Sequence, residues 1–320
     1  MIDILEIARQ KIPLGQNSVI ELDIARLPSG TPIHLNVHVH RSANPGPTLL
    51  ICGGVHGDEV NGVEIVRRAL GERLFKDMKA GSVIAIPLVN VYGFINFSRD
   101  LADGKDVNRS FPGSPTGSLA SRVAHILTNK VVPLFDYGID YHTGGASRHN
   151  HPQIRYSKSD EKAAELAQVF AAPYTIANTP ISKSFRKEAL KKGKPILVFE
   201  GGESLRYDTQ SVEVGIAGLK RVMHHLGMID TAPAADYSTH IFTDTHWIRS
   251  PRSGLFLWHH CSGEYITKGT LLGEINDPQA QEKTPVLANS NGYIVGHNNA
   301  PVVSQGDALF HVGVESFSTI

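Results

Sequence analysis

Three stretches of this 320-residue sequence share one arrangement, in which an apolar run leads to a histidine or glutamate beside glycines. They are CGGVHGDE (52–59), DYHTGG (140–145) and VFEGG (198–202). Short apolar runs bounded by glycines are typical of buried strands. In open sheets of parallel strands, ligands bind beyond the carboxyl ends of the strands. The three endings therefore predict one shared site at the carboxyl edge of a sheet.

The order of the expected elements predicts an α/β fold. Strands are expected at 18–24, 33–40, 48–53, 82–89, 135–142 and 194–202. Helices are expected at 59–72, 118–132, 160–171 and 210–226. Residues 90–117 hold no clear period and predict a long loop, which is uncommon unless the loop serves a function. Strands that alternate with helices indicate a mostly parallel mixed sheet with helices on both faces.

The pattern changes near residue 240, where the strands become short and the helix signals end. We therefore expect two domains, 1–230 with the site and 240–320 as a small all-β domain. A weak internal repeat relates 253–275 to 291–313. This C-terminal part resembles the barrel-sandwich hybrid of biotinyl and lipoyl domains. Those domains carry a modified lysine in the hairpin between their halves, whereas the tip here has none, so a carrier role is disfavoured.

Charge and cysteine content limit the class of protein. Lys plus Arg and Asp plus Glu both number 31, so the basic excess typical of nucleic-acid proteins is absent. No apolar run reaches the length of about 18 residues that a membrane helix needs. The first residues show no basic segment followed by an apolar one, so we expect no signal peptide. Cys52 and Cys261 lie far apart, which disfavours a disulfide framework and favours the cytoplasm.

His56 and Glu59 stand three residues apart on an expected strand-to-helix turn, so both side chains can reach one point. His142 ends a strand at the same edge and would supply a third donor. Two imidazoles and a carboxylate suit Zn²⁺, which in hydrolytic sites takes three protein ligands and leaves a position for water. Asp140 is a candidate to hold the second ring nitrogen of His142. The alternative for His56 and Glu59 is a solvated surface turn. The alternative for His142 is a core or capping histidine.

Glu200 ends an apolar run and is the candidate general base for a water bound to a metal. Glu203 competes with it but lies beyond both glycines. In the long loop, Asn108 and Arg109 place an amide beside a guanidinium, and Arg binds carboxylates through paired hydrogen bonds. A second arginine of this loop, such as Arg99, could stabilise a developing oxyanion. A solvated loop with ordinary surface charges is the alternative.

Taken in order, the segments at His56 to Glu59, Asn108 to Arg109, Asp140 to His142 and Glu200 resemble one known family. This is the succinylglutamate desuccinylase/aspartoacylase family of the zinc carboxypeptidase superfamily. The resemblance covers roughly residues 45–230 and implies a zinc-carboxypeptidase-like fold and one Zn²⁺ per chain.

The resemblance also implies roles for particular residues. The zinc ligands fall on His56, Glu59 and His142, the catalytic glutamate on Glu200, and the pair that binds a substrate carboxylate on Asn108 and Arg109. The oxyanion-stabilising arginine falls on Arg99 if the loop here is slightly longer than in the family. A further arginine and tyrosine that bind substrate are expected among Arg155, Tyr156 and Arg186, and the sequence does not choose among these three.

The sequence therefore predicts a zinc-dependent hydrolase that cleaves the amide bond of a small N-acyl amino acid or N-acylated amine. Its expected partner is a small N-acylated substrate with a carboxylate, not a nucleic acid or a membrane, and a homo-oligomer is compatible with its size. Two alternatives stay open. One is a zinc carboxypeptidase that acts on peptides, with nearly the same site. The other is a catalytically silent carboxylate-binding protein, which would need no general base.

Overall fold

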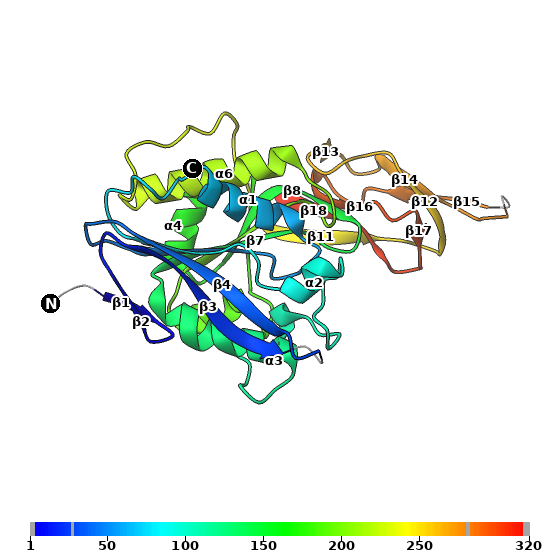
Figure 1. The fold of residues 1–320 in the computed structure, drawn as a ribbon. Helices are drawn as coiled ribbons and strands as arrows, with labels where there is room; N and C mark the ends of the chain where they lie inside the picture. Colours follow the sequence, from blue (N-terminus) through cyan, green and yellow to red (C-terminus); the bar gives the residue numbers. More distant parts are fainter. Residues whose placement is uncertain (1–3, 27–28, 280–281, 316–320) are drawn as a thin grey trace.

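A computed structural model describes residues 4–26, 29–279 and 282–315 and shows an α/β fold built on one large sheet (Figure 1). The strands of this sheet are β3 (Asn17–Arg26), β4 (Pro32–Arg41), β5 (Thr48–Gly53), β6 (Ser82–Ile86), β7 (Tyr137–Gly144), β8 (Arg148–Ser157), β9 (Tyr174–Asn178), β10 (Ile196–Glu203), β11 (His240–Arg249), β13 (Tyr265–Ile266), β16 (Gly292–Asn298) and β18 (Ala308–Glu315). They lie in the order β13-β16-β18-β11-β9-β8-β10-β7-β5-β6-β4-β3. A separate hairpin pairs β1 (Ile4–Ile7) with β2 (Gln10–Pro13).

The direction of the strands differs between parts of the sheet. Strands β6, β5, β7 and β10 run parallel to one another, and so do β8, β9 and β11. The two groups meet antiparallel between β10 and β8, and the outer pairs are antiparallel as well. The prediction of a mostly parallel sheet is right for the centre and wrong for the sheet as a whole. Short connections, such as the one from β3 to β4, can join only antiparallel strands.

Helices cover both faces of the sheet, as predicted (Figure 1). One face carries α1 (Val60–Gly71), α4 (Glu161–Phe170) and α6 (Thr209–His225), and the other carries α3 (Leu119–Ile126) and α5 (Phe185–Lys191). A large apolar core lies on each face. The expected long loop contains the short helix α2 (Val91–Ile95), and the strands β8 and β9 and helix α5 were not predicted. Within the described ranges, none of the helices has the length and apolar character required to span a bilayer.

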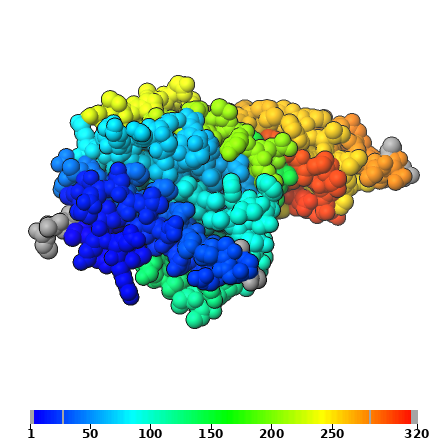
Figure 2. All heavy atoms as spheres, in the orientation of Figure 1, coloured from blue at the N-terminus to red at the C-terminus, as the bar shows by residue number. Residues whose placement is uncertain are grey.

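The C-terminal strands divide between two sheets. A four-stranded sheet contains β15 (Lys283–Leu287), β14 (Leu271–Asn276), β12 (Gly254–Trp258) and β17 (Val302–Val303) in that order. The weak sequence repeat corresponds to a repeated pattern, because the short strand of each copy pairs with the first strand of the other, β13 with β16 and β17 with β12. Figure 2 shows these residues, in orange and red, as a narrow projection from the body.

The large sheet nevertheless crosses the expected boundary between the two domains. Strand β11 pairs with β9 of the α/β body, and β16 pairs with β8. The division into 1–230 and 240–320 therefore stays a prediction. The resemblance to a separate barrel-sandwich hybrid does not account for the half of the C-terminal strands that extend the large sheet.

A hydrogen-bonded clasp joins the C-terminal strands to the body. His149 of β8 lies 3.0 Å by its Nε2 from Oδ2 of Asp208 and 2.7 Å by its Nδ1 from Oγ of Ser262. Asp208 also caps α6, where its Oδ1 accepts a hydrogen bond of 2.7 Å from the N–H of Ser211. The hydrogen bond with His149, followed by those with Ser211, lowers the pKa of Asp208 to about 2. The charge on Asp208 therefore stabilises the folded state.

Asp208→Asn keeps a side chain that can cap α6 but removes this charge, so it should lower the free energy of unfolding at neutral pH. The pKa of Asp208 is about 2 in the folded state and about 4 in the unfolded chain. The stabilisation is therefore present above about pH 4 and is lost as the pH falls through about 2. The loss should be about 1 kcal/mol at pH 7, since the carboxylate is partly solvated.

Urea unfolding of wild type and variant at several pH values measures this difference. The exposed Asp77→Asn serves as the control and should change stability little at any pH. A deficit of Asp208→Asn that stayed constant from about pH 5 to about pH 2, across the titration of this carboxylate, would contradict the assignment.

Candidate active site

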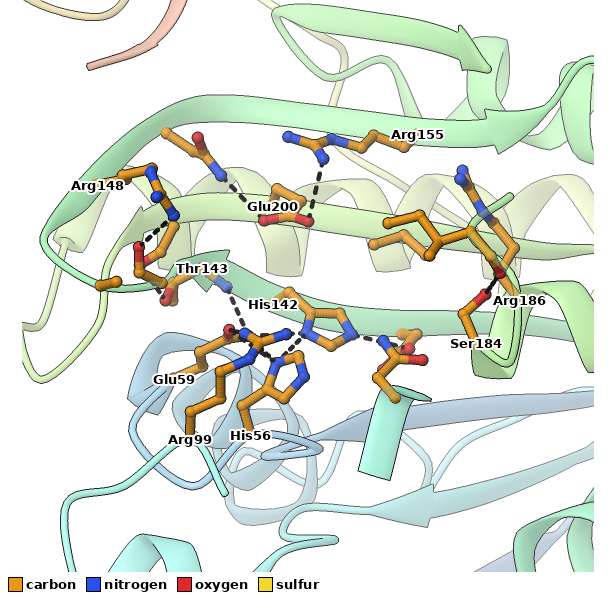
Figure 3. Close-up of a pocket in the computed structure, with 18 of the residues that line it drawn as sticks. His56, Glu59, Arg99, His142, Thr143, Arg148, Arg155, Ser184, Arg186 and Glu200 are labelled. Atoms are coloured by element: carbon orange, nitrogen blue, oxygen red, sulfur yellow. Dashed lines mark hydrogen bonds and ion pairs between the residues drawn. The ribbon is translucent and has the colours of Figure 1, made fainter. Parts of the chain in front are cut away.

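The endings of β5, β7 and β10 lie at one edge of the sheet, as predicted, because these strands are neighbours in the order β10-β7-β5. His56 and Glu59 follow β5 in the turn that leads into α1, His142 lies in β7, and Glu200 lies in β10. The register places Glu200 directly beside His142. All four side chains line one cleft of about 290 Å³, shown in Figure 3.

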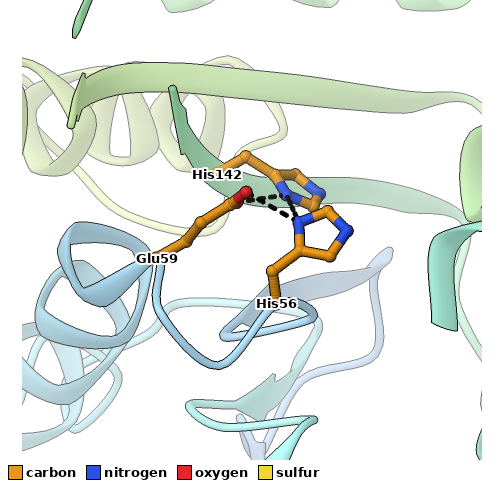
Figure 4. Close-up of side chains that lie close together, drawn as sticks. All are labelled: His56, Glu59 and His142. Atoms are coloured by element: carbon orange, nitrogen blue, oxygen red, sulfur yellow. Dashed lines mark hydrogen bonds and ion pairs between the residues drawn. The ribbon is translucent and has the colours of Figure 1, made fainter. Parts of the chain in front are cut away.

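The side chains of His56, Glu59 and His142 point to a common centre (Figure 4). One donor atom from each lies within 4.8 Å of the others, and all three residues are buried. Oε1 of Glu59 lies 2.8 Å from Nδ1 of His56, and Oε2 lies 2.7 Å from Nδ1 of His142. Within the described part of the chain, this is the one group of three or more His, Cys, Asp or Glu residues whose geometry could hold a metal ion.

Two further carboxylates hold the outer sides of both imidazoles. Oδ1 of Asp106 lies 3.1 Å from Nε2 of His56, and Oδ2 of Asp140 lies 2.9 Å from Nε2 of His142. An Nε2–H that donates to a carboxylate leaves Nδ1 as the acceptor that faces the centre. Two imidazoles and one carboxylate with supported rings are a donor set that fits a divalent cation such as Zn²⁺. Asp140 lies where the sequence suggested, whereas the role of Asp106 was not foreseen.

The electrostatics favour positive charge at this centre. Burial alone would lower the pKa of a histidine, but Glu59 and Asp106 raise the pKa of His56. Asp140 and Glu59 likewise outweigh burial and raise the pKa of His142 well above its ordinary value. Burial would raise the pKa of Glu59, but the two histidines lower it well below its ordinary range. Three carboxylates around two imidazoles thus stabilise protons on the rings or a cation between them.

Gly62 allows the close approach of α1 to β7 that brings Glu59 to His142. A Cβ atom at position 62 would lie 2.4 Å from the carbonyl oxygen of Tyr141, the residue before His142. No ordinary side chain fits this distance, so the helix packs here only with glycine. Glu59 immediately precedes the helix. The sequence turn GDEVNG is therefore part of the geometry that places the carboxylate.

Arg99 lies at the rim of the His56–Glu59–His142 group. Its Nε and Nη2 donate to Oδ2 of Asp106 at 3.2 Å and 2.8 Å, and its Nη1 lies 3.1 Å from Oε1 of Glu59. The same carboxylate of Asp106 therefore holds both Arg99 and His56. This arrangement fixes a guanidinium beside the centre, where it can stabilise negative charge.

The other arginines and the loop amide surround the rest of the cleft. Asn108 and Arg109 line it, and Oδ1 of Asn108 accepts a hydrogen bond of 2.8 Å from the N–H of Phe185 at the start of α5. Arg155 and Arg186 line it too, whereas Tyr156 packs against the apolar core on the α4 side.

The pocket-facing guanidinium of Arg186 is itself largely buried. Its Nη2 donates to Oδ1 of Asn178 at 2.7 Å. Burial, followed by the nearby charge of Arg155, lowers the pKa of Arg186 to about 10, so it stays charged at neutral pH. The cleft thus carries several cations suited to an anionic ligand.

Three further lining residues were missed by the sequence analysis, namely Arg148, Asn150 and Trp247. Nδ2 of Asn150 donates to Oε2 of Glu200 at 2.9 Å, and the guanidinium of Arg148 lies 5.9 Å from the ring of Trp247. Two of them belong to β8, whose polar sequence RHNHPQIRYS carries no clear strand period. Trp247 belongs to β11, beyond the boundary expected for the catalytic part, and no local signal identified it.

Comparisons with known proteins find matches over most of the chain. Residues 45–226 match the model of the succinylglutamate desuccinylase/aspartoacylase catalytic domain. An N-alpha-acetyl-L-2,4-diaminobutyric acid deacetylase from Halomonas elongata is 27% identical over 278 residues, with 82% of this chain and 81% of the relative covered. The crystal structure of a succinylglutamate desuccinylase/aspartoacylase from Rhodobacter sphaeroides has a TM-score of 0.85 at 27% identity and covers 94% of this chain and 96% of its own.

A further structure has the same fold at lower identity. The product-bound ectoine utilization protein EutE (DoeB) from Ruegeria pomeroyi has a TM-score of 0.85 at 23% identity, with 98% of both chains covered. The likeness to these structures thus extends over nearly the whole chain, C-terminal strands included.

Asp140→Asn should weaken metal binding at the His56–Glu59–His142 group, because it removes the charge that holds Nε2 of His142. We expect a loss of zinc affinity of about 10- to 100-fold, the usual effect of removing such a partner. Competition with a chromophoric chelator measures the affinity. The exposed Asp236→Asn is the control. Equal zinc affinity in wild type and Asp140→Asn would argue against a cation at this centre.

Proposed function

The chain belongs to the succinylglutamate desuccinylase/aspartoacylase family, and on that premise we propose that it is a zinc-dependent amide hydrolase. Its substrate would be a small N-acyl amino acid or a related N-acylated amine. Relatives that match it are named as deacylating enzymes. The observation that supports the proposal most strongly is the placement of Glu200 in the same cleft as the His56–Glu59–His142 group.

His56, Glu59 and His142 would hold the cation through Nδ1, a carboxylate oxygen and Nδ1. A bound Zn²⁺ supplies a Lewis acid that polarises a carbonyl and lowers the pKa of a water molecule. Glu200 accepts a proton from the attacking water and delivers it to the nitrogen of the leaving amine. The direct register of Glu200 beside His142 supports this division of roles.

The cations of the cleft would bind the substrate and stabilise the transition state. Arg99, held by Asp106, would stabilise the charge that develops on the carbonyl oxygen. Arg109 and Asn108 would bind a carboxylate of the substrate, and the bond from Phe185 to Asn108 keeps that amide in place. The residues 1–230 would then form the catalytic domain, with Trp247 from the 240–320 region completing the wall of the cleft.

The size of the cleft supports a small substrate over a peptide. A volume of about 290 Å³ lies near the lower end of small-molecule pockets, which run from about 300 Å³ upward. Glu200 also weighs against a silent carboxylate-binding protein, since a carboxylate beside the ligand site repels an anion and serves no purpose in binding alone.

Glu200→Gln should abolish turnover and leave the metal in place, and Glu200→Ala should do the same. Neither side chain can accept the proton, and neither substitution replaces a metal ligand. We expect kcat to fall by about 10²- to 10⁴-fold. The matched control is Glu203→Gln, because Glu203 binds Asn299 instead of lining the cleft. Substantial activity in Glu200→Ala, or equal losses in both positions, would remove Glu200 from this role.

Metal content and turnover can be measured on one preparation of the purified protein. We expect about one zinc per chain and release of free amine from some member of a panel of N-acetyl and N-succinyl amino acids. Chelation should abolish this release and added zinc should restore it. Metal without turnover would favour peptide substrates. A protein that neither contains nor takes up metal would contradict the proposed ligand group.

A further inference from the structure

Glu200 is connected to the C-terminal strands through a single intervening strand. On β10, Gly202 is paired in register with Asn150 of β8. On the other side of β8, Asn150 is paired in register with Gly296 of β16. A row across three strands therefore runs from the segment that carries Glu200 to a glycine in the C-terminal region.

Asn150 sets the orientation of the Glu200 carboxylate. Its Nδ2 donates to Oε2 of Glu200 at 2.9 Å, a normal hydrogen-bond length. The other oxygen, Oε1, lies 3.6 Å from Nη1 of Arg155, which is too long for a hydrogen bond of comparable strength. Asn150 is itself only 6% exposed. Among the described residues, the short contact that fixes the rotation of the carboxylate thus comes from a buried amide.

Gly296 leaves the space in which this amide lies. A Cβ atom at position 296 would lie 2.5 Å from Oδ1 of Asn150, closer than real Cβ contacts, and 3.1 Å from the carbonyl oxygen of His149. The atom in the shorter contact is the end of a side chain, so the amide can rotate away, and the carbonyl of His149 must give only slightly while the strands stay paired. A methyl group at 296 would therefore displace Asn150 at little cost to the fold.

We propose that Asn150 is a positioning residue for Glu200 and that β16, through Gly296, keeps Asn150 in the position that this requires. The C-terminal region thus positions Glu200 through Asn150, in addition to forming part of the cleft wall. The inference rests on the proposed role of Glu200 as the base. It assigns a part in turnover to a residue in the 240–320 region that makes no contact with the cleft.

The test uses Asn150→Ala, Gly296→Ala and the double variant in the full-length, zinc-loaded protein. The substrate is the member of the N-acetyl and N-succinyl panel that the wild type hydrolyses fastest. Each single variant should lower kcat by about 10-fold or more, as a misplaced catalytic group does, with KM and zinc content unchanged. The double variant should lose no more than Asn150→Ala alone, because Gly296→Ala would act only through the amide.

Gly313→Ala is the matched control for general damage to the C-terminal sheet. A Cβ there would lie 2.7 Å from the ring of Phe242, a comparable clash on the neighbouring strand β18. This variant should lower the melting temperature but leave kcat unchanged where it is folded. Wild-type kcat in Asn150→Ala, or a loss from Gly296→Ala that adds in full to that of Asn150→Ala, would overturn the proposal.

A crystal structure of Gly296→Ala provides a test that does not depend on turnover. It should place Nδ2 of Asn150 beyond hydrogen-bond distance of Glu200, and an unmoved amide would overturn the proposal. If the wild type hydrolyses no member of the panel, the proposed function fails, and this structure still decides whether Gly296 positions Asn150. Loss of the amide contact with full kcat would instead refute the positioning role alone.

Discussion

A buried carboxylate between two buried imidazoles is the interaction on which the rest of the site depends. Glu59 is within hydrogen-bond distance of both rings, and the rings are held from outside by Asp106 and Asp140. Buried charges are costly unless they are paired, so no member can be removed without leaving an uncompensated charge. Much of the surrounding structure serves this arrangement. Gly62 lets α1 approach β7, and Arg99 offsets part of the negative charge.

The sequence predicted the parts of the site that follow from local pattern. Glycine-bounded apolar runs predicted β5, β7 and β10, and the rule for parallel strands brought His56, His142 and Glu200 to one edge. The remaining residues depend on long-range pairing. Asn150 reaches Glu200 only because β8 enters antiparallel between β10 and β9, and its polar sequence has no period that would predict a strand. Trp247 reaches the cleft only because the sheet continues into the C-terminal region.

Residue type alone would misidentify the clasp formed by Asp208, His149 and Ser262. An acid, an imidazole and a hydroxyl stand within hydrogen-bond distance, as in a nucleophilic triad. Acyl transfer also needs donors for an oxyanion, and the backbone N–H groups of Ser262 and Gly263 already donate to His297 and Ile294. The carboxylate is engaged at the start of α6 as well. The group therefore ties three elements together and lacks these two donors for chemistry.

The antiparallel strand β8 explains why the C-terminal strands belong to the same sheet. Its residues 153–157 pair with β9, whereas residues 148–150 lie before that pairing begins. The backbone groups of this first part would be left at an open edge, and unpaired edges are unfavourable in folded proteins. Strand β16 covers them by pairing 296–298 with 148–150. The backbone pairing that closes this edge also brings a strand without a side chain at Gly296 against Asn150, so satisfying the main chain and placing the partner of Glu200 are one structural requirement.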